Sequence, residues 1–356
     1  MKHLRPIAIA LACSPLCLAF HQPATKIAFA VDEGVTLKKV FTSQLELELD
    51  EMRILRNGQE PDGLPELEMR VVTDFEVVVE DEYLGLRSGA SSKLRRTYDS
   101  IGMDMQMTME MDLQGQTKTQ DTEAPSNSKL EGKTVQFEWN AEDGEYHTSF
   151  VDEDGDKDLL EGLLEDMDLR AFLPDHEVEI GDEWTVEPHL IGAVLAPGGN
   201  LKLIPEDLGY DMGSMGGQMG ELSDWFDENL GGKVTCRLSA TRPQDGISVA
   251  VIQIEIKLEN KVDLTEMARE ELESVDLPPD TGELEVEHML LELKIEGDGL
   301  LLWDLTNGHF HALDISGDLE MNMDIGVNLV LPGFGAVSTE QQFDMSGDLT
   351  FGAEIQ

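Results

Sequence analysis

Residues 67–79 read Leu-Glu-Met-Arg-Val-Val-Thr-Asp-Phe-Glu-Val-Val-Val, and this stretch decides the fold. Its apolar side chains mostly occupy every second position, which is the period of a β-strand with one buried face. Thirteen residues of strand would measure roughly 40 Å, more than twice the common strand length. Strands of this length twist and coil, so the stretch predicts a strongly curved sheet.

The same alternation recurs before and after this stretch. It returns in residues 45–49, 135–139, 250–258 and 283–296. Asn57-Gly58 and Asn307-Gly308 are typical hairpin turns, because both residue types tolerate a positive φ. We therefore expect an α+β fold that is mainly antiparallel, with two long-stranded, curved, half-barrel-like sheets.

Two amphipathic segments predict one helix against each sheet. In residues 158–172, Leu160, Leu163 and Met167 share a helical face, and Pro174 ends the helix. Residues 263–275 carry a similar apolar stripe. Short echoes between the halves, such as Glu66-Leu-Glu-Met and Glu283-Leu-Glu-Val, predict an internal duplication.

The chain divides into a leader, two β-rich domains and a Gly/Met-rich segment between them. These parts are residues 1–30, 31–188, 233–356 and 189–232, respectively. The Gly/Met-rich segment would be a linker or a flap, because glycine loses much backbone entropy in regular structure.

The leader resembles a signal peptide. Lys2 and Arg5 form a basic start, residues 7–20 are apolar, and Ala28-Phe29-Ala30 offers small residues for cleavage. Because no segment is apolar enough to span a bilayer, we expect an exported protein, periplasmic or extracellular, that does not cross the membrane.

Charge excludes one class of partner. The chain carries 73 acidic and 25 basic residues, a net charge of −48, which would repel nucleic-acid phosphates. The acidity has two explanations, a solvated surface or a site for a divalent cation such as calcium, and we favour the first. The basic cluster of Lys93, Arg95 and Arg96 would balance neighbouring carboxylates.

Five methionines at alternate positions form the clearest candidate site. Met103, Met105, Met107, Met109 and Met111 would point to one face of a strand. Thioethers bind copper(I), but methionine more often fills irregular apolar space. If the face lines a cavity, the flexible side chains would suit varied apolar ligands.

Motifs for catalysis are missing. The sequence has no Gly-x-Ser-x-Gly elbow, no His-Glu-x-x-His helix and no phosphate-binding glycine loop, so no catalytic residue is assigned. His309 and His311 could hold zinc or copper with Asp304 or Asp314, although polar residues beside a hairpin turn are ordinary.

A signature around a tryptophan resembles that of secreted bacterial β-rich proteins of unknown function. It consists of Leu173-Pro174 followed by Val178-Glu-Ile-Gly-Asp-Glu-Trp184, with Gly299-Leu-Leu-Leu-Trp-Asp304 later in the chain. The resemblance implies export and a β-rich fold, and it supplies no catalytic residues. Physically, Gly181 and Asp182 would form a tight turn that delivers Trp184 into the core.

These observations favour an exported, non-enzymatic protein that binds an apolar ligand, a lipid or a lipoprotein, on a curved sheet. Likeness to open-barrel lipoprotein and lipid carriers is fold analogy alone. The alternative is a structural or calcium-binding protein of the cell envelope, and a hydrolase has the least support.

Overall fold

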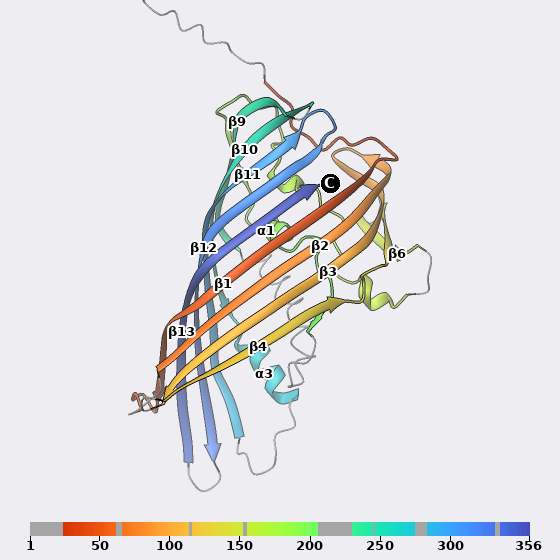
Figure 1. Cartoon of the computed structure of the whole chain (residues 1–356). Coiled ribbons are helices and arrows are strands. Elements are labelled where there is room, and N and C mark those ends of the chain that lie inside the picture. Colours follow the sequence, from red (N-terminus) through yellow and green to blue (C-terminus); the bar gives the residue numbers. More distant parts are fainter. Residues whose placement is uncertain are drawn as a thin grey trace, which may run out of the picture.

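The computed structural model describes residues 24–61, 66–113, 116–151, 155–205, 230–244, 246–274, 283–331 and 335–356. Antiparallel strands make up most of it (Figure 1). In chain order the strands are β1 (Thr36–Arg56), β2 (Glu66–Arg87), β3 (Ala90–Leu113), β4 (Gln116–Ser128), β5 (Thr134–Asn140), β6 (Glu145–Phe150), β7 (Glu183–Val186), β8 (Leu203–Pro205), β9 (Gly231–Gln244), β10 (Ile247–Asp263), β11 (Glu283–Asp304), β12 (His309–Leu331) and β13 (Gly335–Ile355). Two α-helices are described, α1 (His189–Leu195) and α3 (Thr265–Ser274). None of the helices in these ranges is long and apolar enough to cross a membrane.

All these strands belong to one sheet. Its order is β6-β5-β3-β2-β1-β13-β12-β11-β10-β9-β7, with β4 paired to β3 and β8 paired to β4. The junction of the two halves is the pairing of β1 with β13, from Lys39 opposite Ile355 to Arg56 opposite Thr339. The expectation of two sheets is therefore wrong. Two separate sheets would leave the long edges of β1 and β13 without hydrogen-bond partners, and this pairing satisfies both.

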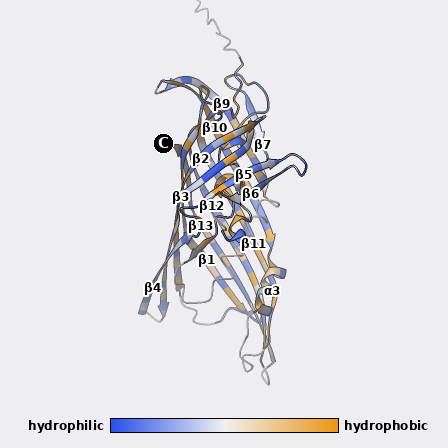
Figure 2. Cartoon of the chain, turned by 90° about the vertical axis from the view of Figure 1, so that its right-hand side faces the viewer, coloured by the Kyte–Doolittle hydropathy of each residue, from blue (hydrophilic) through white to orange (hydrophobic). Residues whose placement is uncertain are grey.

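The sheet curls into a half-barrel-like trough, with α1 and α3 on its inner side (Figure 1). Glycines permit the sharp coiling where neighbouring strands come close. A β-carbon at Gly297 would lie 2.6 Å from the carbonyl oxygen of Ser316, and one at Gly347 would lie 1.7 Å from that of Glu46. Apolar and polar positions alternate along the strands (Figure 2), so the inner face is largely apolar. The internal duplication stays a prediction.

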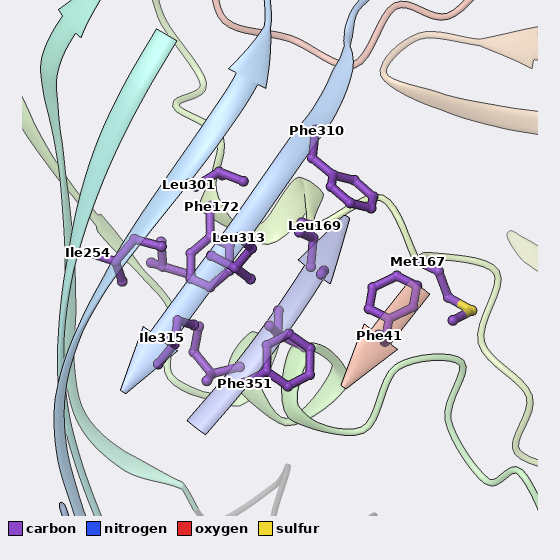
Figure 3. Packing of buried hydrophobic residues seen from close by; sticks show 14 of the residues in the cluster. Phe41, Met167, Leu169, Phe172, Ile254, Leu301, Phe310, Leu313, Ile315 and Phe351 are labelled. Carbon is purple, nitrogen blue, oxygen red and sulfur yellow. The ribbon is translucent and has the colours of Figure 1, made fainter. Parts of the chain in front are cut away.

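One hydrophobic core contains side chains from both halves of the chain. Figure 3 shows Phe41 of β1, Phe310 of β12 and Phe351 of β13 in the same cluster as Met167 and Phe172. Residues 157–182 and 187–199, on either side of β7, contribute the inner layer of this core, against the concave side of the sheet. The core therefore does not divide at residues 189–232, where the sequence placed a linker or flap; residues 206–229 lie outside the described ranges.

The helix expected over residues 158–172 is wrong. The structure has only short 3-10 turns there, at Lys157–Leu160 and Arg170–Phe172, with positive φ at Gly162 and Leu169. Two backbone carbonyls that would accept hydrogen bonds within a helix are bonded to the sheet instead. Arg96 of β3 donates to the carbonyls of Leu164 and Glu165 at 2.9 Å each. By contrast, α3 lies inside the range 263–275 where the second helix was expected.

Residues 24–30, which the sequence analysis placed at the end of the leader, belong to the folded core. Thr25 forms a backbone bridge with Val178, and the Ala30 N–H donates to the Gly308 carbonyl at 2.8 Å. Ile27 and Phe29 are buried in the core. We therefore expect any leader that is removed to end before Thr25.

Two truncations test this placement. Removing residues 1–23 should leave the free energy of unfolding unchanged, whereas removing residues 1–30 should lower it by several kcal/mol. The loss follows because buried large side chains contribute about 2–5 kcal/mol each when deleted, and Ile27 and Phe29 are both lost. Urea denaturation of the two purified products measures the difference, and equal midpoints would contradict the assignment of this segment to the core.

Candidate apolar-ligand site on the concave face

The expected methionine stripe lies on the concave side of the sheet. Register places Met107 of β3 opposite Val71 of β2, and Val71 opposite Leu47 of β1, so the three side chains share a face. Leu47 belongs to the hydrophobic core, which identifies this face as the inner one. We call the following side chains the methionine face: Met103, Met105, Met107, Met109, Met111, Leu67, Met69, Val71, Phe75, Leu45, Leu47 and Leu49.

Burial changes along this face. Phe41, Val77 and Ile101 lie across from one another on the same three strands and are fully buried. Further along the strands, all five methionines of β3 are only half-buried. Contiguous apolar surface that keeps contact with solvent is a usual sign of a binding site.

The far side of the trough continues the same chemistry. A second apolar cluster joins α3 to β10, β11 and β12, and consists of Val262, Leu264, Leu291, Met267, Met289, Met321 and Met323. Arg269 fastens α3 to the sheet by donating to the backbone carbonyls of Val286 and Glu287 at 2.8 and 3.0 Å. Methionine adapts its shape to its neighbours, so both walls of the trough can repack around a guest.

A cavity of about 470 Å³ adjoins the inner face of β1. Its lining is mainly apolar, with Arg170 and two carboxylates among the lining residues, and includes Phe41, Met167, Leu169, Leu190 and Val194. Phe41, which lines the cavity, lies on the same face of β1 as Leu45, four residues before it. The cavity therefore adjoins the fully buried end of the methionine face.

Four charged side chains are fully buried above the methionine face. Lys39 donates to Asp81 at 2.7 Å, to Asp168 at 2.6 Å and to the hydroxyl of Tyr83 at 2.8 Å. Arg96 forms two bonds to Asp81, at 2.7 and 2.8 Å. Because Asp168 lies in the irregular segment, this buried cluster fixes residues 164–170 against the sheet.

The cluster sets the ionisation of its members. Burial alone would raise the pKa of Asp81, but the adjacent Arg96 and Lys39 outweigh it and hold this pKa below its usual value. Burial and the nearby Asp168 raise the pKa of Tyr83 well above normal, so the phenol stays protonated and donates to Asp168.

Sequence reasoning recognised only part of this cluster. Arg96, Arg95 and Lys93 do pair with carboxylates, those of Asp81, Glu82 and Glu138. The other members of the cluster could have been found from their positions in the sequence, because a charged residue stands at an inward, otherwise apolar position of β1 and of β2. On β1, Lys39 lies on the same inward face as Leu37 and Phe41. On β2, Asp81 lies on the same inward face as Val79 and Tyr83.

The two histidines of the other expected site lie beside the hairpin turn between β11 and β12. His309 Nε2 lies 4.0 Å from Asp304, and His311 is the extra residue of a β-bulge between Phe310 and Ala312. Burial alone would raise the pKa of Asp304, but hydrogen bonds from Asn307 and Thr306 in the hairpin turn outweigh it and lower this pKa. Within the described ranges no group of three or more His, Cys, Asp or Glu residues is placed to hold a metal ion. The copper, zinc and calcium sites stay predictions.

The Gly-Asp-x-Trp signature forms a structural turn. Gly181 has a φ of 100° and donates its N–H to the Leu238 carbonyl at 2.8 Å. The Asp182 carboxylate accepts the N–H of Glu179 at 2.8 Å. Trp184 follows into the core, where its indole N–H donates to the Phe172 carbonyl at 3.0 Å.

The buried cluster leads to a stability prediction with a matched control. Asp81→Asn should lower the free energy of unfolding at pH 7 by about 3–5 kcal/mol, because Arg96 loses its paired carboxylate and two buried cations are left with Asp168 as the one remaining anion of the cluster. The control is Asp99→Asn, which removes the exposed ion pair between Asp99 and Lys38, the residue before Lys39 on β1. This substitution should change the free energy of unfolding little.

The stability lost in Asp81→Asn should depend on pH, in a direction set by the lowered pKa of Asp81. A lowered pKa in the folded state stabilises it above the ordinary aspartate pKa of 3.8, and this contribution disappears as the pH falls below that value. The difference between wild type and Asp81→Asn, measured by chemical denaturation, should therefore shrink below about pH 4. A difference that grew on acidification would contradict the proposed charge state.

Comparison with known proteins adds no family to this geometry. No known protein-family model matches the chain, and a search of curated proteins finds no significant match.

Proposed function

We propose that this protein binds an apolar ligand, the acyl chain of a lipid or of a lipoprotein, on the methionine face. The observation that carries the proposal is the half-burial of all five methionines of β3 on the inner side of a single curved sheet. Ligand sites are typically concave, mainly apolar and largely preformed. Flexible thioether side chains suit a guest without fixed shape.

The free energy of binding sets a minimum length for the acyl chain of the ligand. Each methylene removed from water contributes about 0.8 kcal/mol, and association costs at least about 4 kcal/mol in lost motion. Ten buried methylenes therefore yield a net of about −4 kcal/mol, which corresponds to millimolar affinity. Sixteen methylenes reach the micromolar range. The strand from Met103 to Met111 measures roughly 26 Å, long enough to accompany such a chain.

A binding role also agrees with the chemistry of the one described cysteine. Cys236 is buried on β9, and burial raises the pKa of its thiol to about 12. The thiol therefore stays protonated at neutral pH and is a poor nucleophile. A hydrolase built on this cysteine has no support.

A specific observation keeps the calcium-dependent envelope protein as the second candidate. Glu46, Asp348, Asp318 and Glu296 stand directly opposite one another on four neighbouring strands. Arg70 pairs with Glu46 and Lys257 lies opposite Glu296, so the repulsion between like charges, which bound cations would relieve, falls mainly on Asp348 and Asp318. Calcium that raises the melting temperature, in a protein that takes up no apolar probe, would favour this candidate over the first.

A pair of variants tests the methionine face. Met105→Gln with Met107→Gln keeps the length of both side chains but adds polar groups, and should weaken binding of the uncharged fluorophore N-phenylnaphthylamine about tenfold or more. Each substitution removes roughly 1 kcal/mol of apolar contact, since the side chains are only half-buried.

Gln106→Glu is the control, because Gln106 is exposed and lies between these methionines on the opposite face of β3. It should bind the fluorophore as wild type does. Fluorescence titration gives both affinities, and circular dichroism checks that the variants fold. Equal affinities in folded wild type and double variant would remove the methionine face as the binding site.

A further inference from the structure

Asn260 is a polar residue at an inward position of β10. The strand alternates strictly here, and Ile254, Ile256, Leu258 and Val262 occupy the other inward positions. Asn260 is only 6% exposed. An amide side chain thus stands where the pattern of the strand places an apolar one.

The amide of Asn260 has no bonding partner. Neither Oδ1 nor Nδ2 forms a hydrogen bond with any part of the chain that the structure describes. Most buried polar groups are paired, and an unpaired one destabilises the fold. The inward charges Lys39, Asp81 and Arg96 follow this rule through their mutual bonds. Asn260 is therefore a buried polar group for which the described chain supplies no partner.

Register connects Asn260 to the methionine face. Asn260 lies opposite Leu293, Leu293 opposite Met321, Met321 opposite Met345, and Met345 opposite Leu49. Four interstrand steps measure roughly 19 Å, so a long acyl chain on the methionine face can extend to this row. Met321, two strands from Asn260 in this row, is partly buried against Val262, Leu264 and Leu291, and its three rotatable side-chain bonds let the row adapt its shape.

We propose that Asn260 recognises an uncharged polar group of the bound lipid, an ester or amide carbonyl, by donating from Nδ2. This inference rests on the proposed binding of an apolar ligand. An asparagine offers two donors and an acceptor but no charge, so it matches a neutral group. The net charge of −48 disfavours an anionic headgroup on the same protein. The ligand class is thus a neutral acyl ester or acyl amide.

The test compares methyl palmitate with octadecane, an alkane of similar length, as competitors for bound N-phenylnaphthylamine. Wild type should bind the ester about fivefold more tightly than the alkane, the value of one neutral hydrogen bond. Asn260→Leu should bind the alkane as wild type does and lose the preference for the ester. Asn260→Ser, which keeps a donor, should retain part of it.

Thermal unfolding without ligand supplies a second readout. Asn260→Leu should raise the melting temperature, because it replaces an unpaired buried amide with an apolar group of similar size. A lowered melting temperature would overturn the inference, since it would mean that the amide is satisfied in the free protein. Equal affinity of wild type for ester and alkane would overturn the role of Asn260 while the apolar site stands. Binding of neither competitor would overturn the site and the inference together.

Discussion

The backbone pairing between β1 and β13 is the constraint on which the rest of the structure depends. It joins the first and last strands of the chain along almost their whole length, so two sequential meanders become one curved sheet with one inner face. A sheet of long strands must twist and coil, and a curled sheet has a concave side that something must fill. The protein fills part of it with its own residues 157–182 and 187–199, and the remainder presents methionines.

The buried ionic cluster decides where the filled part ends. Lys39, Asp81 and Arg96 come from the sheet, and Asp168 comes from the irregular segment, so the contacts hold a chain without regular hydrogen bonding in a fixed place. Burying four charges is costly unless each finds opposite charge and hydrogen bonds, and two cations with two anions meet both conditions. The methionine face begins where these contacts stop.

Local pattern was sufficient to predict the strands but not their partners. Alternation in residues 67–79 and 103–111 correctly predicted long strands, because the side-chain period is set by neighbouring residues alone. The choice of β13 as the partner of β1 joins residues about 300 positions apart, and no local signal encodes it. The helix expected at 158–172 failed for a related reason. Leu163 and Met167 are buried as the pattern required, but Leu164 is exposed, and Arg96 of β3 binds the carbonyls of Leu164 and Glu165. Tertiary contacts overrode a helical period that was real but short.

Polar residues at inward strand positions are more informative about contacts than apolar ones, because each needs a specific hydrogen-bonding or charged partner. Each breaks the alternation at an energetic cost, so each must have a compensating partner somewhere. At Lys39, Asp81 and Arg96 the partner lies within the chain, and the residues therefore serve the fold. At Asn260 the described chain contains no partner, although the residue lies on the same continuous inner face. Asn260 also lies in the row of apolar side chains that leads across the sheet to the methionine face, and for this reason we propose a ligand as its partner.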